Sequence, residues 1–265
     1  MLISRLYRVL LLAGLLPALP AEACRVTDFF EVALPSPTAG RSAIAVALEA
    51  AYPGLQVNED AGTVVMPSGA VLPLGDDAGR PAPKRLADTT IAEQFAQLYP
   101  LDFDPAHREA PWFDRGRARN EAFFRALWFE TERAAAASLV AVTYSGAELR
   151  TRFSVTSAHC VAAQLQAAFD AIARHGDGMD VYFRSVGGGF NWRKIAGTDR
   201  LSTHSFGIAV DLNTALGGYW RWAGAREGAV GPFGNSYPEE LVREMERHGF
   251  IWGGKWHHFD GMHFE

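Results

Sequence analysis

Residues 202–211, Ser-Thr-His-Ser-Phe-Gly-Ile-Ala-Val-Asp, are the stretch around which the rest of the chain is organised, together with residues 260–265, Asp-Gly-Met-His-Phe-Glu. These two pieces contain two histidines and three carboxylates among glycines, small apolar residues and aromatic residues. Two imidazoles and one carboxylate are enough to hold a zinc ion, and a further carboxylate is then free to act as a base. The two stretches therefore predict a metal centre.

The chain must turn within the first stretch for its polar groups to meet. The β-branched residues after Gly207 favour an extended segment. In a straight strand, the odd separation of His204 and Asp211 would place their side chains on opposite faces. A turn near Gly207 brings them together, and glycine permits that backbone conformation. The same reasoning applies to Asp260 and His263, which are three apart with a glycine between them.

His204, Asp211 and His263 are the predicted metal ligands, with a fourth position left for water. Two neutral imidazoles and one carboxylate leave a net charge near +1, which brings the pKa of that water down to about 7. Asp260 is the predicted base, which takes the proton of the water and hands it to a departing amine. The alternative is a polar core without a metal. The two histidines at 257–258 are expected on the surface or beside the ligands.

The pattern S-x-H-x-x-G-x-A-x-D at 202–211, followed by D-x-x-H at 260–263, resembles that of the zinc D-alanyl-D-alanine carboxypeptidases of the VanY type. Their relatives include L-alanyl-D-glutamate endopeptidases of phage lysis. The resemblance covers about residues 182–265. It implies one zinc ion per chain, held by the two histidines and the first aspartate, and it implies that Asp260 is the base. Many members have glutamate at that position, whose longer arm reaches about one C–C bond further.

The resemblance also implies an arginine ahead of the first motif that binds the scissile carbonyl. Arg184 is similar to that residue, and Arg193 is the competing candidate, otherwise expected to bind substrate. A guanidinium suits this task because it keeps its charge while the carbonyl acquires one. Ser202 either hydrogen-bonds the substrate or caps a turn. Glu265 either orients His263 or is a free chain end.

The composition is that of a globular protein. The chain has 265 residues, of which 48% are hydrophobic and 21% are charged, and it can bury a substantial core. Its formal net charge is −5 and it has no long basic run, so nothing indicates a nucleic-acid partner. We expect a monomer that acts on peptidoglycan stem peptides, a substrate class implied by the resemblance. The alternative is a cell-wall peptide-binding protein that keeps the fold but does not cleave.

Residues 1–23 predict an export signal. Two arginines precede the apolar run 9–19, and Ala-Glu-Ala at 21–23 supplies a small-residue cleavage site. The apolar run is too short to be a stable bilayer anchor. We therefore expect a secreted or periplasmic protein with no integral membrane segment after cleavage, beginning near Cys24.

Cys24 and Cys160 are the only cysteines of the chain. A disulfide between them is permitted in an oxidising compartment, but their spacing does not show that they lie close together. Alternatively, Cys24 is a lipidated N-terminus. The preceding residues, Ala21 and Glu22, match a lipoprotein processing site poorly, which makes a lipid anchor the weaker alternative.

The pattern of elements predicts an α+β fold with a small, mostly antiparallel sheet and flanking helices, and the resemblance implies that this fold is similar to that of the LAS metallopeptidases. Two strand-like runs at 139–144 and 148–156 form a hairpin. A patterned helix follows at 158–175 and a strand at 180–184. A last helix over 238–248 begins with proline and is followed by glycine.

The region ahead of these elements is predicted to be accessory. We divide the mature chain into an accessory region or linker at 24–88 and a peptidase domain at 89–265, with its core motifs at 180–265. Three arginines at 115, 117 and 119 are able to bind a carboxylate, although a solvated face or an internal ion pair is the commoner role. The other predicted elements are a helix near 42–51, a hairpin of 63–66 and 70–72, a helix at 92–98 capped by Thr89 or Thr90, and a helix ending near 128.

Overall fold

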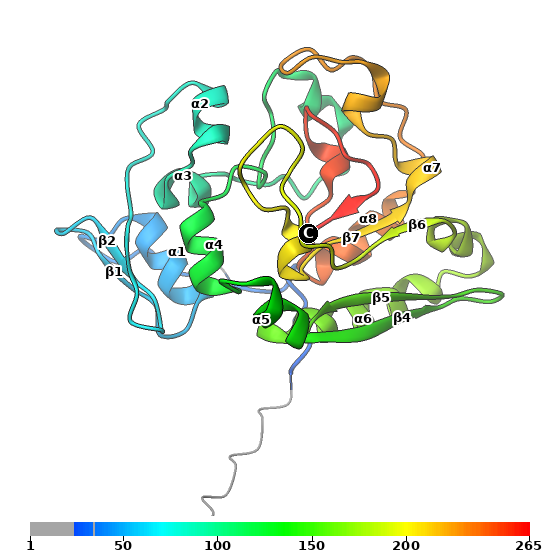
Figure 1. The fold of residues 1–265 in the computed structure, drawn as a ribbon, viewed down its shortest axis with the longest axis horizontal. Coiled ribbons are helices and arrows are strands. Elements are labelled where there is room, and N and C mark those ends of the chain that lie inside the picture. The colour runs from blue at the N-terminus through cyan, green and yellow to red at the C-terminus, as the bar shows by residue number, and fades with distance from the viewer. Residues whose placement is uncertain (1–23, 34) are drawn as a thin grey trace, which may run out of the picture.

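The computed structural model describes residues 24–33 and 35–265, which form an N-terminal lobe (residues 41–97 and 118–127) and a larger C-terminal lobe (residues 139–265) (Figure 1). The predicted export signal lies outside the described residues. Among the described residues, small antiparallel sheets are combined with helices, which confirms the predicted α+β class. In the same part of the chain, no helix has the length and apolar character needed to cross a bilayer.

The N-terminal lobe packs short helices against a three-stranded antiparallel sheet. The Ser42 hydroxyl caps the first helix by accepting a hydrogen bond at 3.1 Å from the N–H three residues on. Thr90 and Glu93 form a capping box at the third helix, which ends earlier than predicted. The predicted first helix and hairpin are confirmed. The elements are α1 (Ala43–Ala51), β1 (Gln56–Asn58), β2 (Thr63–Val65), β3 (Val71–Pro73), α2 (Ala82–Ala87), α3 (Ile91–Phe95) and α4 (Glu121–Leu127).

This lobe has a hydrophobic core of its own. Leu48 of α1 and Phe123 of α4 are fully buried in it. The rings of Tyr52, Phe95 and Phe123 meet edge to face, with centroids 5.4 to 6.0 Å apart. Because α3 and α4 lie beyond residue 88, this core draws on both sides of the boundary predicted there. The accessory region is therefore part of a packed unit.

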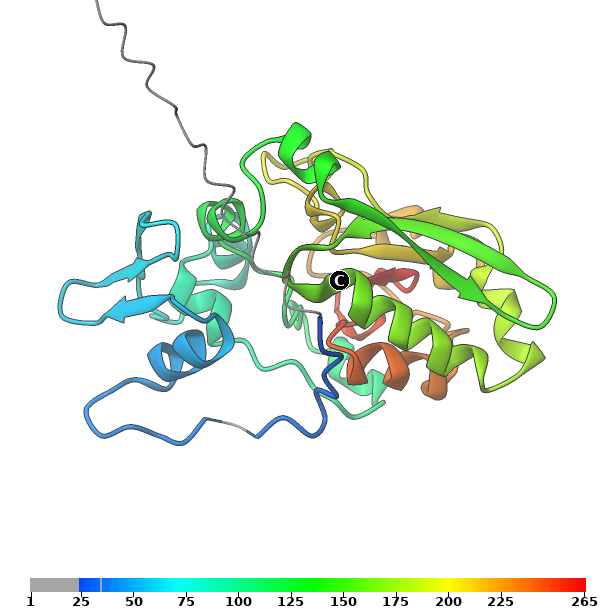
Figure 2. The same ribbon diagram turned by 90° about the horizontal axis from the view of Figure 1, so that it is seen from below.

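The C-terminal lobe is built on the predicted hairpin and helices. Strands β4 (Leu139–Ser145) and β5 (Arg150–Thr156) pair antiparallel, and α6 (Val161–Ala173) packs on them. Helix α8 (Glu239–Arg247) lies beside α6 (Figure 2). Phe169 of α6 is fully buried in the main core between these elements. All four elements are confirmed to within a few residues.

The strand predicted at 180–184 is wrong, because this segment belongs to a 3-10 helix, η3 (Asp177–Phe183). Asp180 accepts hydrogen bonds of 2.9 Å from the Tyr144 hydroxyl and the Glu148 N–H. Phe183 stacks on Tyr144 with ring centroids 3.6 Å apart. In a strand, residues three apart face opposite sides, whereas in a 3-10 helix they lie on the same side. Asp180 and Phe183 therefore both reach Tyr144.

Cys24 and Cys160 form a disulfide with a Cα–Cα distance of 5.4 Å. The bond fixes the first described residue at the N-terminus of α6. The Cys24 thiol is thus engaged within the protein, which counts against the lipid-anchor alternative.

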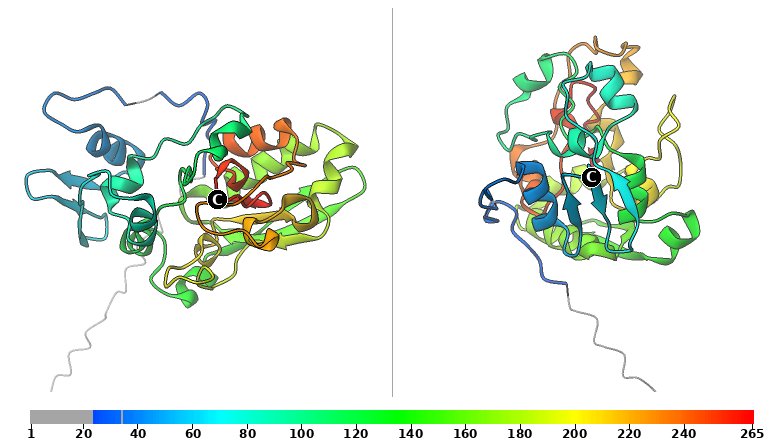
Figure 3. Two further views of the ribbon diagram at one scale, coloured as in Figure 1. Left: turned by 90° about the horizontal axis from the view of Figure 1, so that it is seen from above. Right: turned by 90° about the vertical axis from the view of Figure 1, so that its left-hand side faces the viewer.

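A third sheet lies inside the C-terminal lobe, while the N-terminal lobe forms one end of the molecule (Figure 3). Its strands are β6 (Val186–Gly188), β7 (Val210–Asn213) and β8 (His263–Phe264), in the order β6-β7-β8, and both pairings are antiparallel. The shorter helical elements are η1 (Pro105–Glu109), α5 (Glu132–Ala137), η2 (Ala158–Cys160), η4 (Thr203–Phe206), α7 (Thr214–Gly217), η5 (Trp220–Ala223) and η6 (Gly253–Lys255).

Candidate metal centre

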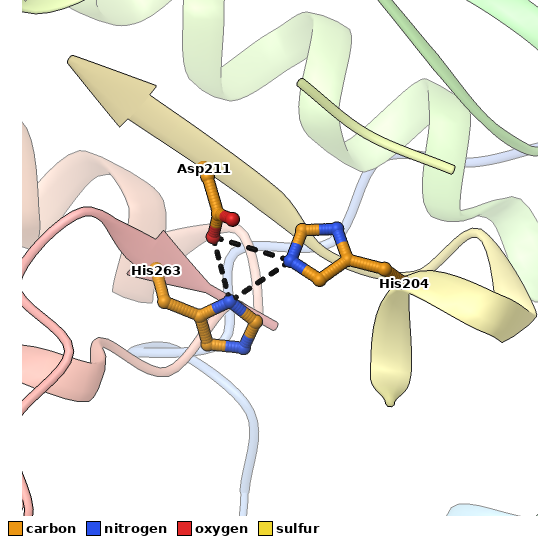
Figure 4. A group of neighbouring side chains, drawn as sticks. All are labelled: His204, Asp211 and His263. Atoms are coloured by element: carbon orange, nitrogen blue, oxygen red, sulfur yellow. Dashed lines mark hydrogen bonds and ion pairs between the residues drawn. The ribbon is translucent and has the colours of Figure 1, made fainter. Parts of the chain in front are cut away.

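Three side chains from separate elements converge on one point: His204 of η4, Asp211 of β7 and His263 of β8 (Figure 4). The His204 Nε2 atom lies 3.2 Å from His263 Nδ1 and 3.2 Å from Asp211 Oδ1. The His263 Nδ1 atom lies 2.8 Å from Asp211 Oδ1. Both histidines are buried, and the carboxylate is mostly so. The structure therefore brings together all three predicted ligands.

The predicted turn places His204 on the side of the sheet that carries Asp211. Residues 203–206 form a single 3-10 turn, and Gly207 ends it with φ +70°. A side chain at Gly207 would be strained at that φ and would bring its Cβ within 3.0 Å of the Thr156 nitrogen. The chain then enters β7 in the extended form that its β-branched residues favour.

The antiparallel register brings Asp211 and His263 together. The two residues are direct partners across β7 and β8, so their side chains lie on the same face. On the other side of β7, a Cβ at Gly187 would approach the Asp211 Cβ to 2.7 Å. The glycine beside β7 thus leaves room for the carboxylate.

Both imidazoles have their outward nitrogens engaged by acceptors. His204 Nδ1 lies 2.6 Å from the Gly189 carbonyl oxygen, and His263 Nε2 lies 3.0 Å from Glu265 Oε2. An N–H that donates to such an acceptor fixes the tautomer and leaves the other nitrogen with a lone pair. Those other nitrogens are the two that face Asp211. The donor set is two nitrogens and one oxygen, which fits a catalytic zinc ion.

The electrostatics of the centre also favour a cation. Burial would raise the pKa of Asp211. With protons on the inward nitrogens in place of a metal ion, hydrogen bonds from His204 and His263 hold that pKa well below its ordinary range. Burial lowers the pKa of His263, but hydrogen bonds with Asp211 and Glu265 outweigh this and raise it to about 10. The carboxylates thus draw positive charge to the point between the three donor atoms.

Asp260 lies in the same cavity and has the environment of a base. Its Oδ1 atom is buried and has no hydrogen-bond partner among the described residues. Burial raises the pKa of this carboxyl to about 6, against the opposing effect of His263. An orphaned carboxylate oxygen beside a metal centre is suited to accept a proton.

The cavity that contains these groups has a volume of about 340 Å³. Ser202 and Arg193, the two residues predicted to contact substrate, are among the residues that line it. The Ser202 hydroxyl makes no capping bond to η4, so the structure does not show the turn-capping role. The residues that line the cavity are Arg117, Arg119, Arg193, Ile195, Ala196, Ser202, Thr203, His204, Asp211, Thr214, Tyr219, Trp222, Trp256, His258, Asp260, Met262, His263 and Glu265.

Arg184 requires a correction. Its side chain is exposed and does not belong to the lining of the cavity. The 3-10 helix that replaces the predicted strand ends just before Arg184, so the segment does not carry this side chain to the centre. The structure instead places Arg117 and Arg119, together with Arg193, in the cavity wall.

Sequence reasoning missed two features around the centre. Arg119 contacts Glu265 at 2.6 Å as an internal ion pair, whereas its spacing gave no sign of the partner. His258 is buried and lines the cavity, which agrees with the predicted position beside the ligands and not with the surface alternative. Its partner was not predicted: its Nδ1 lies 2.6 Å from Asp114 Oδ2. Asp114 and Arg119, the partners of His258 and Glu265, come from a segment far from the motifs. The alternating arginines of this segment were its only signal in the sequence.

A His–Asp–His donor set with a spare buried carboxyl, held in a cavity of an α+β fold, is an arrangement typical of metal-dependent hydrolytic centres. Residues 196–265 match a family model described as D-alanyl-D-alanine carboxypeptidase, which confirms the resemblance predicted from the sequence. The matched segment contains all three candidate ligands and Asp260, and over it the chain is similar to a family of zinc metallopeptidases. Comparisons with curated proteins and with solved structures give no significant match.

Proposed function

We propose that this protein is an exported zinc peptidase that hydrolyses amide bonds in peptidoglycan stem peptides and acts as a monomer with one zinc ion. The observation that carries the proposal is the convergence of His204, Asp211 and His263 beside Asp260 in one cavity. The match to a D-alanyl-D-alanine carboxypeptidase family over this segment supports the reaction and the substrate class.

The three donor atoms that would hold the metal are His204 Nε2, Asp211 Oδ1 and His263 Nδ1. Zinc bound there supplies a Lewis acid that polarises the scissile carbonyl and lowers the pKa of the attacking water. The Gly189 carbonyl oxygen and the Glu265 carboxylate keep both imidazoles oriented toward this point.

Asp260 moves the proton. In its ionised form it accepts a proton from the water that attacks the amide carbon, and it then donates that proton to the departing amine. Its buried Oδ1 atom has no competing hydrogen bond among the described residues, which keeps it available for this transfer.

Two arginines in the cavity are candidates to bind the negative charge of the substrate. Arg193 is exposed at the cavity wall. The Arg117 side chain is 16% exposed, and its closest ion-pair contact is to Asp114 at 3.8 Å, too long for a hydrogen bond. A guanidinium from either residue, placed beside the scissile carbonyl, would stabilise the oxyanion that forms on the carbonyl.

The Cys24–Cys160 bond supports export, because disulfides persist in oxidising compartments and are rare in the cytosol. The predicted signal at residues 1–23 points the same way. A peptidase outside the cytosol would meet peptidoglycan directly.

The proposal is tested by mass analysis of purified peptidoglycan fragments incubated with the zinc-loaded protein and two variants. The wild type should release D-alanine or expose a new amino terminus. Asp260→Ala should keep its zinc and lose hydrolysis, whereas His263→Ala should lose both. Casein is the control substrate, since cleavage of ordinary L-peptides would contradict the substrate class. A wild-type protein that binds the fragments without any product would favour the non-catalytic alternative.

A further inference from the structure

Arg119 belongs to the N-terminal lobe, yet its side chain lines the cavity of the metal centre. We propose that Arg119 is a positioning residue of this centre, which acts through Glu265 to hold His263 in its ligand orientation. The inference rests on the proposed zinc site and adds to it a contribution from the part of the chain outside residues 196–265.

The contact between Arg119 and Glu265 is close and buried. The Arg119 Nη1 atom donates to both carboxylate oxygens of Glu265, at 2.6 Å each. The two side chains are 10% and 6% exposed. Charge-assisted hydrogen bonds in such surroundings are stronger than neutral ones, and they lose little to solvent screening.

The same carboxylate contacts both histidine-bearing segments of the centre. Glu265 Oε2 accepts a hydrogen bond of 2.7 Å from the hydroxyl of Thr203, the residue before His204. It also lies 3.0 Å from His263 Nε2. Arg119 therefore fixes a carboxylate that joins η4 to the outward nitrogen of His263.

Hydrogen bonds hold the residues on both sides of Arg119. The carbonyl of Ala118 accepts a bond of 2.7 Å from the Gln97 amide. The Asn120 N–H donates to the side chain of Gln94 at 2.8 Å, and the Asn120 amide donates to the Thr89 carbonyl at 2.7 Å. These bonds tie the backbone that carries the Arg119 side chain to the N-terminal lobe.

Removal of Arg119 would leave the buried Glu265 carboxylate without its counter-ion. Such a carboxylate is strongly destabilised, so it would turn away or draw in water. Each of these outcomes weakens the acceptor that orients His263. Loss of a group that orients a ligating imidazole typically lowers metal affinity 10- to 100-fold.

The test compares Arg119→Gln with a matched control, Arg80→Gln. The control breaks another arginine–glutamate pair of the same lobe, Arg80 with Glu93, which is not part of the cavity lining. Two readouts are taken: the rate at which a chelator removes zinc, and the visible spectrum of the cobalt-substituted protein, which reports ligand geometry. Thermal unfolding of each variant shows whether it is folded.

Arg119→Gln should lose zinc about 10- to 100-fold faster than wild type and shift the cobalt bands, whereas Arg80→Gln should do neither. Arg119→Lys should recover part of the loss, because an ammonium can pair with Glu265 but lacks the planar fork. If Arg119→Gln does not fold, Glu265→Gln decides, and it should change both readouts in the same direction. Unchanged zinc release and an unchanged spectrum in a folded variant would overturn the inference. A wild type that binds no zinc would instead overturn the proposed function.

Discussion

The disulfide between Cys24 and Cys160 makes the clearest quantitative prediction about stability. Its replacement by two serines removes a covalent link between residues 136 positions apart. The contacts that dock the N-terminal segment remain. The Gln164 side chain still exchanges hydrogen bonds of 2.9 and 3.0 Å with the Thr27 backbone, and Arg247 still pairs with Asp28 at 2.6 Å. The native fold should therefore persist, and the effect should fall on the unfolded chain.

The size of the effect follows from the length of the closed loop. In the chain-entropy model a cross-link across about 100 residues stabilises the folded state by about 4.7 kcal/mol, and the value grows with the logarithm of loop length. For the separation in this chain we expect a loss of about 5 kcal/mol. A domain of this size changes its Tm by roughly 2–4 °C per kcal/mol, so Tm should fall by roughly 10–20 °C.

Thermal and urea unfolding of the Cys24→Ser, Cys160→Ser variant measures this loss. The oxidised wild type is the reference, and wild type unfolded with a thiol reductant present should resemble the variant. A loss below about 1 kcal/mol, when mass analysis shows the bond intact in the reference, would refute the loop-entropy reasoning. Free thiols in the purified wild type would refute the pairing itself.

Three further predictions concern the centre. Burial raises the pKa of Asp260 to about 6, and a bound cation lowers it from that value. Because only the ionised carboxylate can accept a proton, the active form is lost as pH falls through this pKa. We therefore expect kcat/KM to drop about tenfold per pH unit somewhere below pH 6. A flat profile down to pH 4 would exclude Asp260 as the base. Gly207→Ala should destabilise the fold by about 1–2 kcal/mol, since φ is +70° there, and equal Tm values would contradict this. Arg184→Ala should leave kcat/KM unchanged, and Arg193→Ala should lower it. A loss with Arg184→Ala alone would restore Arg184 as the residue that binds the scissile carbonyl.

The ligands were predictable from the sequence because their information is local. The spacing of His204 and Asp211 requires a turn, and Gly207 is the residue that permits one. The pairing of Asp211 with His263 also follows from an antiparallel register once the two motifs are assigned to neighbouring strands. The backbone conformation within a few residues of each motif is thus enough to bring these side chains together.

The remaining features depend on contacts between distant segments, which spacing does not encode. The strand predicted at 180–184 gave way to a 3-10 helix because Asp180 and Phe183 both pack on Tyr144, some forty residues earlier. The same difference left Arg184 outside the cavity. The ion pair of Arg119 with Glu265 likewise joins residues that are 146 positions apart in the sequence. Tertiary packing decided these cases, and local propensity did not.

The most direct test of the central claim is anomalous diffraction at the zinc edge from crystals of the zinc-loaded protein. The account predicts one strong peak, about 2.0–2.2 Å from His204 Nε2, Asp211 Oδ1 and His263 Nδ1. The exposed group of Asp102, Asp104 and His107 also brings three possible donors together, and it serves as the internal comparison. A peak at that second group with none at His204, Asp211 and His263 would contradict the account.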